Sequence, residues 1–151
     1  MKYSIAILSL CAFPALANVE ITGSVEAKCV IQTTKNGVYG NPIGILPIIR
    51  YDVSIADSYT ANITHPTAFS SSPSLSDTIA WTGSTTVTQT SIAGMSGYEA
   101  AKIVVGNTTI FDLTLAGSTW FSTASSAVYG SAKPLPGGNY TAVVQATCIA
   151  K

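Results

Sequence analysis

One stretch near the start of the chain, residues 18–29 with the sequence NVEITGSVEAKC, alternates between two kinds of side chain. The intervening even positions are polar, and the odd positions are apolar or small: Val19, Ile21, Gly23, Val25 and Ala27. A side-chain period of two over nine residues predicts a β-strand with one buried face. We expect this strand to lie at the free end of the mature chain, where it can pair within its own molecule or with a neighbouring one.

The first 17 residues have the organisation of a secretory signal peptide. Lys2 provides a basic start, an apolar run follows, and residues 15–17 match the small-residue A-x-A cleavage pattern. The alternative is a lipoprotein signal with Cys11 as the acylated residue, but Leu10 before it is too bulky for that cleavage. Cleavage after residue 17 leaves 134 of the 151 residues, which is the length of one domain.

Charge is scarce along the whole chain. Only 9% of the residues are charged, and seven Lys and Arg balance seven Asp and Glu. The sequence therefore lacks the basic patch that nucleic acid or anionic lipid would require, and no apolar run after the leader approaches the length of a membrane span. Because a freely soluble monomer normally keeps a charged surface, this composition favours a protein whose surface is partly covered in an assembly.

Two cysteines, Cys29 and Cys148, remain after the leader. In an exported chain such a pair predicts one disulfide, which would close a loop of roughly 120 residues and stabilise the fold by about 4–5 kcal/mol. Two cysteines and the single His65 are too few ligands for a metal site, so no metal or cofactor is expected. No nucleophile-and-base pattern surrounds His65, and we predict no catalytic residue and no enzymatic activity.

Turn signals and alternating or β-branched runs predict roughly seven or eight short strands, which favours an all-β sandwich of the immunoglobulin type. The expected strand segments are residues 19–31, 50–64 (two strands or one bulged strand), 78–90, 98–105, 107–115 and 140–149, with residues 42–49 as an edge segment. Residues 98–105 are also compatible with a two-turn helix. We favour a strand there, because an isolated helix of that length is marginal.

The last predicted strand, residues 140–149, again alternates. One face carries Tyr140, Ala142, Val144, Ala146 and Cys148. Only Ala150 and Lys151 follow, so we expect no later strand to complete the sandwich.

Both ends of the chain resemble one family, the pilins of bacterial chaperone–usher fimbriae. Residues 18–31, NVEITGSVEAKCVI, are similar to the N-terminal extension and first body strand of these pilins. Residues 134–150, PLPGGNYTAVVQATCIA, are similar to their C-terminal strand, with Tyr140 at the aromatic position. The resemblance covers about thirty residues closely and looks nearest to the archaic or colonisation-factor-like branches. The chain departs from common pilins in its predicted disulfide. Common pilins bridge the first body strand to the following strand, whereas here the first body strand would be bridged to the last.

The resemblance implies an immunoglobulin-like sandwich that lacks its last strand and is completed by a donor strand from a neighbouring subunit. It divides the chain into a signal peptide (1–17), a donor strand (18–28) and a pilin body (29–151). The implied groove-filling residues are Val19, Ile21, Gly23, Val25 and Ala27. The implied groove edge is the final strand, with Tyr140, Ala142, Val144 and Ala146.

The implied function is that of a structural subunit of an extracellular fimbria, exported through the periplasm, polymerised by donor-strand exchange and supporting adhesion and biofilm formation. The implied partners are identical subunits in a helical homopolymer, with a periplasmic chaperone and an outer-membrane usher during assembly. The alternative is a secreted monomeric β-sandwich that binds glycans as an adhesin, through Trp81 or Trp120. A third, weaker reading is a small secreted inhibitor or toxin-like domain.

Overall fold

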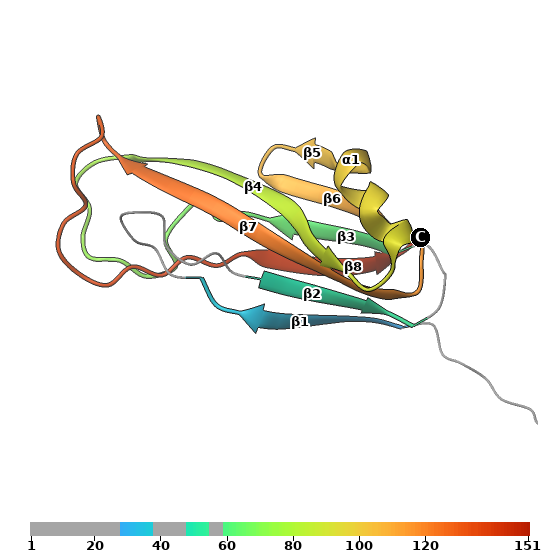
Figure 1. Ribbon diagram of the computed structural model, residues 1–151. Coiled ribbons are helices and arrows are strands. Elements are labelled where there is room, and N and C mark those ends of the chain that lie inside the picture. Colours follow the sequence, from blue (N-terminus) through green and yellow to red (C-terminus); the bar gives the residue numbers. More distant parts are fainter. Residues whose placement is uncertain (1–27, 38–47, 55–58) are drawn as a thin grey trace, which may run out of the picture.

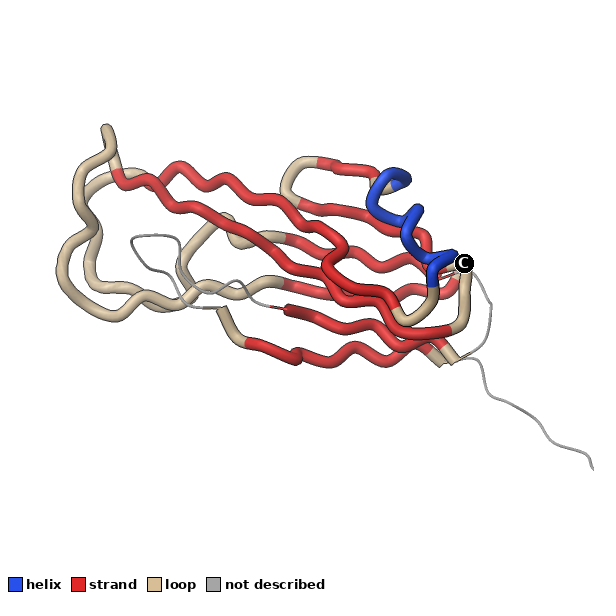
Figure 2. The backbone as a smooth tube through the Cα atoms, viewed as in Figure 1, coloured by secondary structure: helices blue, strands red, loops and turns tan. Residues whose placement is uncertain are grey.

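The computed structural model describes residues 28–37, 48–54 and 59–151. Within these ranges, two antiparallel four-stranded sheets pack face to face, which confirms the all-β, two-sheet architecture (Figures 1 and 2). The first sheet has the order β1 (Cys29–Lys35), β2 (Ile48–Val53), β7 (Gly117–Tyr129) and β4 (Ile79–Thr90). The second has the order β5 (Ile103–Val105), β6 (Thr108–Leu113), β3 (Tyr59–Thr64) and β8 (Gln145–Ala150). A 3-10 helix η1 (Ala93–Gly97) and a short helix α1 (Tyr98–Ala101) connect β4 to β5.

The core lies between the sheets and is built from alternate residues of each strand. In β2 and β3 every second side chain is buried: Ile49, Tyr51 and Val53 in the first sheet, and Tyr59, Ala61 and Ile63 in the second. Phe121 of β7 packs between Tyr51 and Phe111, with ring centroids 5.4 and 4.5 Å away. The expected strand region 50–64 is therefore two strands, and they belong to opposite sheets.

The expectation of a strand over residues 98–105 is wrong for its first half. Residues 98–101 form helix α1, and only Ile103–Val105 is strand β5. Tyr98 is buried, and its hydroxyl oxygen accepts the backbone N–H groups of Thr114 and Leu115 at 3.1 and 3.0 Å. These tertiary contacts stabilise a helix that is too short to be stable by itself.

Helix α1 lies against the edge of the sandwich formed by β4 (Figure 1). The Glu99 carboxylate accepts the Val87 N–H at 2.8 Å, and the Lys102 ammonium donates to the Thr85 carbonyl at 3.0 Å. Glu99 and Lys102 also form an ion pair with each other. The unpaired backbone groups of an edge strand are a template for strand addition, and here side chains from the α1 segment cover two of them.

Replacing Glu99 with alanine is expected to lower the free energy of unfolding by about 1–3 kcal/mol, because it leaves the Val87 N–H without its acceptor and Lys102 without its counter-ion. Urea denaturation measures the loss. The control is Asp112→Ala, whose ion pair with Lys151 is about half exposed and should contribute less than about 1 kcal/mol. Equal losses in the two variants would contradict this role of Glu99.

The last strand begins later than the sequence indicates. Alternation predicts a strand from residue 140, but β8 starts at Gln145, and upstream of it Thr141 pairs only through an isolated bridge with Ser71. The reason is the length of the partner strand. Thr64, the last residue of β3, pairs with Gln145, and His65 and Pro66 follow it, so no ladder partner remains for residues 140–144.

Candidate functional site: the open edge between β1 and β8

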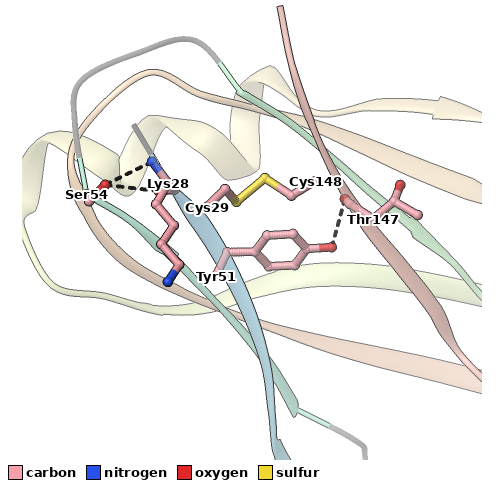
Figure 3. Close-up of a disulfide and its surroundings, with 6 residues drawn as sticks. All are labelled: Lys28, Cys29, Tyr51, Ser54, Thr147 and Cys148. Carbon is pink, nitrogen blue, oxygen red and sulfur yellow. Dashed lines mark hydrogen bonds between the residues drawn. A yellow bond between two sulfur atoms is a disulfide. The ribbon is translucent and has the colours of Figure 1, made fainter. Parts of the chain in front are cut away.

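Strands β1 and β8 lie at the side of the sandwich away from helix α1 (Figure 1). They belong to different sheets, and in the described part of the chain each pairs with one neighbour only, β1 with β2 and β8 with β3. A disulfide between Cys29 and Cys148 joins them, with Sγ atoms 2.03 Å and Cα atoms 6.4 Å apart (Figure 3). We refer to this pair of strands as the open edge.

The outer side of β8 carries backbone groups that β3 does not use. Just beyond the β3–β6 ladder, the His65 N–H donates to the Asn107 carbonyl at 3.0 Å. Because bonding directions alternate along an antiparallel strand, Thr64, Asn62 and Thr60 direct their backbone groups toward β8. Their partners on β8 are Gln145, Thr147 and Ile149. The backbone groups of Ala146, Cys148 and Ala150 therefore point away from the sheet.

The same pattern holds on β1. The Ser54 N–H donates to the Lys28 carbonyl at 3.0 Å, one residue before the strand begins. Alternation from this bonded pair turns Val30 toward β2 and leaves the backbone groups of Cys29 and Ile31 facing outward. Two rows of backbone donors and acceptors thus line the open edge, one from each sheet.

The inward-facing side chains along the open edge are incompletely covered. On the adjoining strands β2 and β3 the inward side chains are buried. On the open edge, however, the side chains that pack against the core are only partly buried: Cys29, Ile31, Ala146 and Cys148. Val144, the residue before β8, is also only partly buried. A strand laid along this edge would pair with backbone groups that no described strand uses and would also cover partly buried apolar side chains, which are the two contributions that drive strand addition.

Tyr51 lies under the disulfide and connects the two sheets (Figure 3). Its side chain is fully buried, and its hydroxyl donates to the Thr147 carbonyl of β8 at 3.2 Å. Burial raises the pKa of the Tyr51 phenol well above its usual value of 10.0, because the phenolate would have to form away from water.

The raised pKa of Tyr51 predicts a loss of stability in alkali. In the unfolded chain the Tyr51 phenol ionises near its ordinary pKa, whereas in the folded chain it stays neutral. The contribution of Tyr51 to stability is therefore constant below about pH 10 and falls as the pH rises further. Tyr51→Phe should lose about 1 kcal/mol at neutral pH through the missing hydrogen bond, and should lose less stability between pH 9 and pH 11 than the wild type. Urea denaturation across that pH range tests this. Parallel losses in both proteins would show that Tyr51 does not titrate as stated.

The structure assembles only part of the predicted site. Ala146 and the two cysteines lie on the open edge. Val144 and Ala142 continue their alternation before β8 and are partly buried. Tyr140 lies outside β8, in the loop before it, and its hydroxyl donates to the Pro136 carbonyl at 2.7 Å. Its ring packs on Phe69 with centroids 4.9 Å apart. The predicted donor residues Val19, Ile21, Gly23, Val25 and Ala27 lie outside the described residues.

Sequence reasoning did not identify Ile31 or Tyr51 as parts of this site. The apolar alternation of residues 49–53 marks Tyr51 as a core residue, but its bond to Thr147 depends on the packing of two sheets. The other candidates occupy structural positions. The Arg50 guanidinium lies over the Trp120 ring, 5.2 Å from its centroid. His65 fills the space beside Gly83, where a Cβ atom would meet the imidazole at 2.5 Å.

Other kinds of site are not found in the described part of the chain. It contains no group of three or more His, Cys, Asp or Glu placed to hold a metal ion. None of its helices is long and apolar enough to cross a membrane. No known family model, curated protein or solved structure matches the chain.

Proposed function

We propose that this protein is a structural subunit of an extracellular fimbria, and that the open edge accepts the N-terminal strand of the next copy. The single observation that carries the proposal is the open edge itself, where two edge strands present outward backbone groups above half-buried apolar side chains. The occupant we infer is the segment from Val19 to Ala27, because it alternates with the period of a strand that has one apolar face.

The strand order supports an immunoglobulin-like sandwich that needs one more strand. In immunoglobulin domains four strands form one sheet in the order A-B-E-D, and C, F and G form the other. The order β1-β2-β7-β4 corresponds to the first of these. In the other sheet the neighbours β3 and β8 correspond to C and F, and β6 and β5 extend the sheet beyond β3. In this interpretation the position of strand G lies beside β8, on the side where Ala146 and Cys148 direct their backbone groups.

Side chains from the α1 segment cover backbone groups on one edge of the sandwich, whereas no described helix does so on the other, and this difference also supports the proposal. On the β4 side, Glu99 and Lys102 bond to backbone groups of the edge strand. The open edge carries a disulfide but has no helix across it in the described part of the chain. Soluble proteins normally cover or blunt a long edge, so an edge that no described strand pairs with, beside partly buried apolar side chains, favours a docking function.

The apolar face of the donor segment is large enough to make the contact strong. Val19, Ile21 and Val25 each contribute roughly 1.5–3 kcal/mol when fully buried, and Ala27 contributes less. Backbone bonds to β8 add to this total. Once formed, such a complex persists because its dissociation is slow, so fibre durability is a kinetic property.

Gel electrophoresis in SDS tests the proposal. Protein purified from the surface of expressing cells should run as a ladder of multimers without heating and collapse to a monomer band after boiling. Negative-stain electron microscopy of the same sample should show thin fibres. A protein that stays monomeric under both conditions, with a cooperative melt and no assembly factor, would favour the secreted binding module instead.

A further inference from the structure

We infer that the Cys29–Cys148 disulfide is the path by which a pulling force crosses each subunit of the fibre. The inference rests on the proposed function and concerns the mechanics of the same site. The disulfide joins the strand proposed to accept a donor, β8, directly to the residue that follows the proposed donor segment and Lys28.

The positions of the two cysteines carry the argument. Cys148 lies within β8, among the residues whose backbone groups face the incoming strand. Cys29 is the first residue of β1, immediately after Lys28. Force applied by a donor strand paired with β8 therefore reaches the subunit's own N-terminal segment through one side-chain bridge. The force therefore bypasses the 118 residues that lie between the two cysteines, which are 119 positions apart in the sequence.

The disulfide also joins the two edge strands on this side of the sandwich. In the described part of the chain, β1 is hydrogen-bonded to β2 alone and β8 to β3 alone, and no ladder connects β1 with β8. Each can be peeled from its sheet while the remaining strands stay paired. A covalent link between them prevents this, because neither strand can move away from the other by more than the bridge allows.

Without the bridge, the same force would have to pass through the hydrogen-bonded ladders and the core. Opening the subunit would then release the segment between the two cysteines. A separation of 119 residues corresponds to roughly 40 nm of extended chain. The presence or absence of an extension of this length under load therefore shows whether force passes through the disulfide.

Single-fibre force spectroscopy on wild-type fibres tests the inference. Fibres assembled with the disulfide formed should show no extension step as long as roughly 20 nm before they rupture. The same fibres reduced in place with a phosphine should show steps of roughly 40 nm per subunit. Reduction after assembly avoids any folding defect in a cysteine variant. Assembled Cys29→Ala/Cys148→Ala fibres provide a second comparison, since they should extend with and without reductant.

Two results would overturn the inference while leaving the proposed function intact. Oxidised fibres that extend in steps of roughly 20 nm would show that force enters through another strand, such as β4, about halfway along the loop between the cysteines. Reduced fibres that remain as inextensible as oxidised ones would show that the disulfide transmits no force. Absence of fibres and of SDS-resistant multimers would instead remove the proposed function, and this inference with it.

Discussion

Replacing Ala146 with proline is expected to leave the subunit folded and to abolish its ability to accept a donor strand. The Ala146 N–H points away from β3, so proline removes no hydrogen bond from the existing ladder. Proline is tolerated at such positions on edge strands. It does remove one donor from the open edge, and its ring occupies the path of an approaching backbone. One substitution thus separates folding from assembly.

The unheated SDS ladder measures the effect of Ala146→Pro, and circular dichroism measures its fold. The variant should run as a monomer, with a wild-type spectrum and a melting temperature within a few degrees. Ala146→Ser is the matched control, because it keeps both the N–H and the small side chain, and it should form the ladder. An Ala146→Pro protein that multimerises like the wild type would show that strands do not add at β8.

Removing the disulfide should produce the largest change in stability. The bridge closes a loop with a sequence separation of 119, for which the chain-entropy estimate is about 4–5 kcal/mol. Small domains have only about 5–15 kcal/mol in total, so Cys29→Ala/Cys148→Ala should lose a large part of its stability. We expect its melting temperature to fall by on the order of 15 °C.

Calorimetry with and without reductant tests this estimate. Reductant should lower the melting temperature of the wild type by a similar amount and leave the double alanine variant unchanged, which controls for other effects of the reagent. A loss below about 1 kcal/mol would mean that the unfolded chain is already compact around the two cysteines, or that the bridge strains the folded state.

The sequence predicted the strands whose burial alternates. Residues 49–53 and 59–63 alternate between buried and partly exposed side chains, so the period of two is visible in the letters themselves. Their assignment to opposite sheets was not predictable, because it depends on which strands pair. Helix α1 was missed for a related reason, since Tyr98 and Glu99 are held by contacts with β6, β4 and the loop after β6 rather than by local helix propensity.

Strand β7 shows where hydrophobic patterning fails. Its second half is rich in Ser and Ala and carries no apolar period, and the sequence analysis predicted no strand anywhere in residues 117–129. Thr123 is nevertheless fully buried, and its hydroxyl bonds to that of Thr85 on β4 at 3.0 Å. A small hydroxyl that finds a partner across the ladder can occupy the core like an apolar side chain. Counting apolar residues cannot detect such a position.

The disulfide of the candidate site could be predicted from the sequence, but the direction of the backbone groups along the open edge could not. The two cysteines that remain after the expected leader predicted the pairing of Cys29 with Cys148. Alternation identified Ala146 as inward-facing. Predicting the open edge would have required the strand registers. The outward direction of the Ala146 and Ile31 backbone groups follows from the register of β8 on β3 and of β1 on β2. Register depends on long-range pairing, which no local pattern in this sequence fixes.

If one copy's N-terminal strand completes another copy's open edge, two assembly-deficient variants with opposite defects should complement each other when they are mixed. A variant lacking residues 18–27 should accept a strand but donate none, while Ala146→Pro should donate a strand but accept none. Each should be monomeric by itself. Together they should form a one-to-one, heat-labile, SDS-resistant dimer and nothing larger. No dimer in the mixture, or multimers of either variant alone, would contradict this mode of assembly.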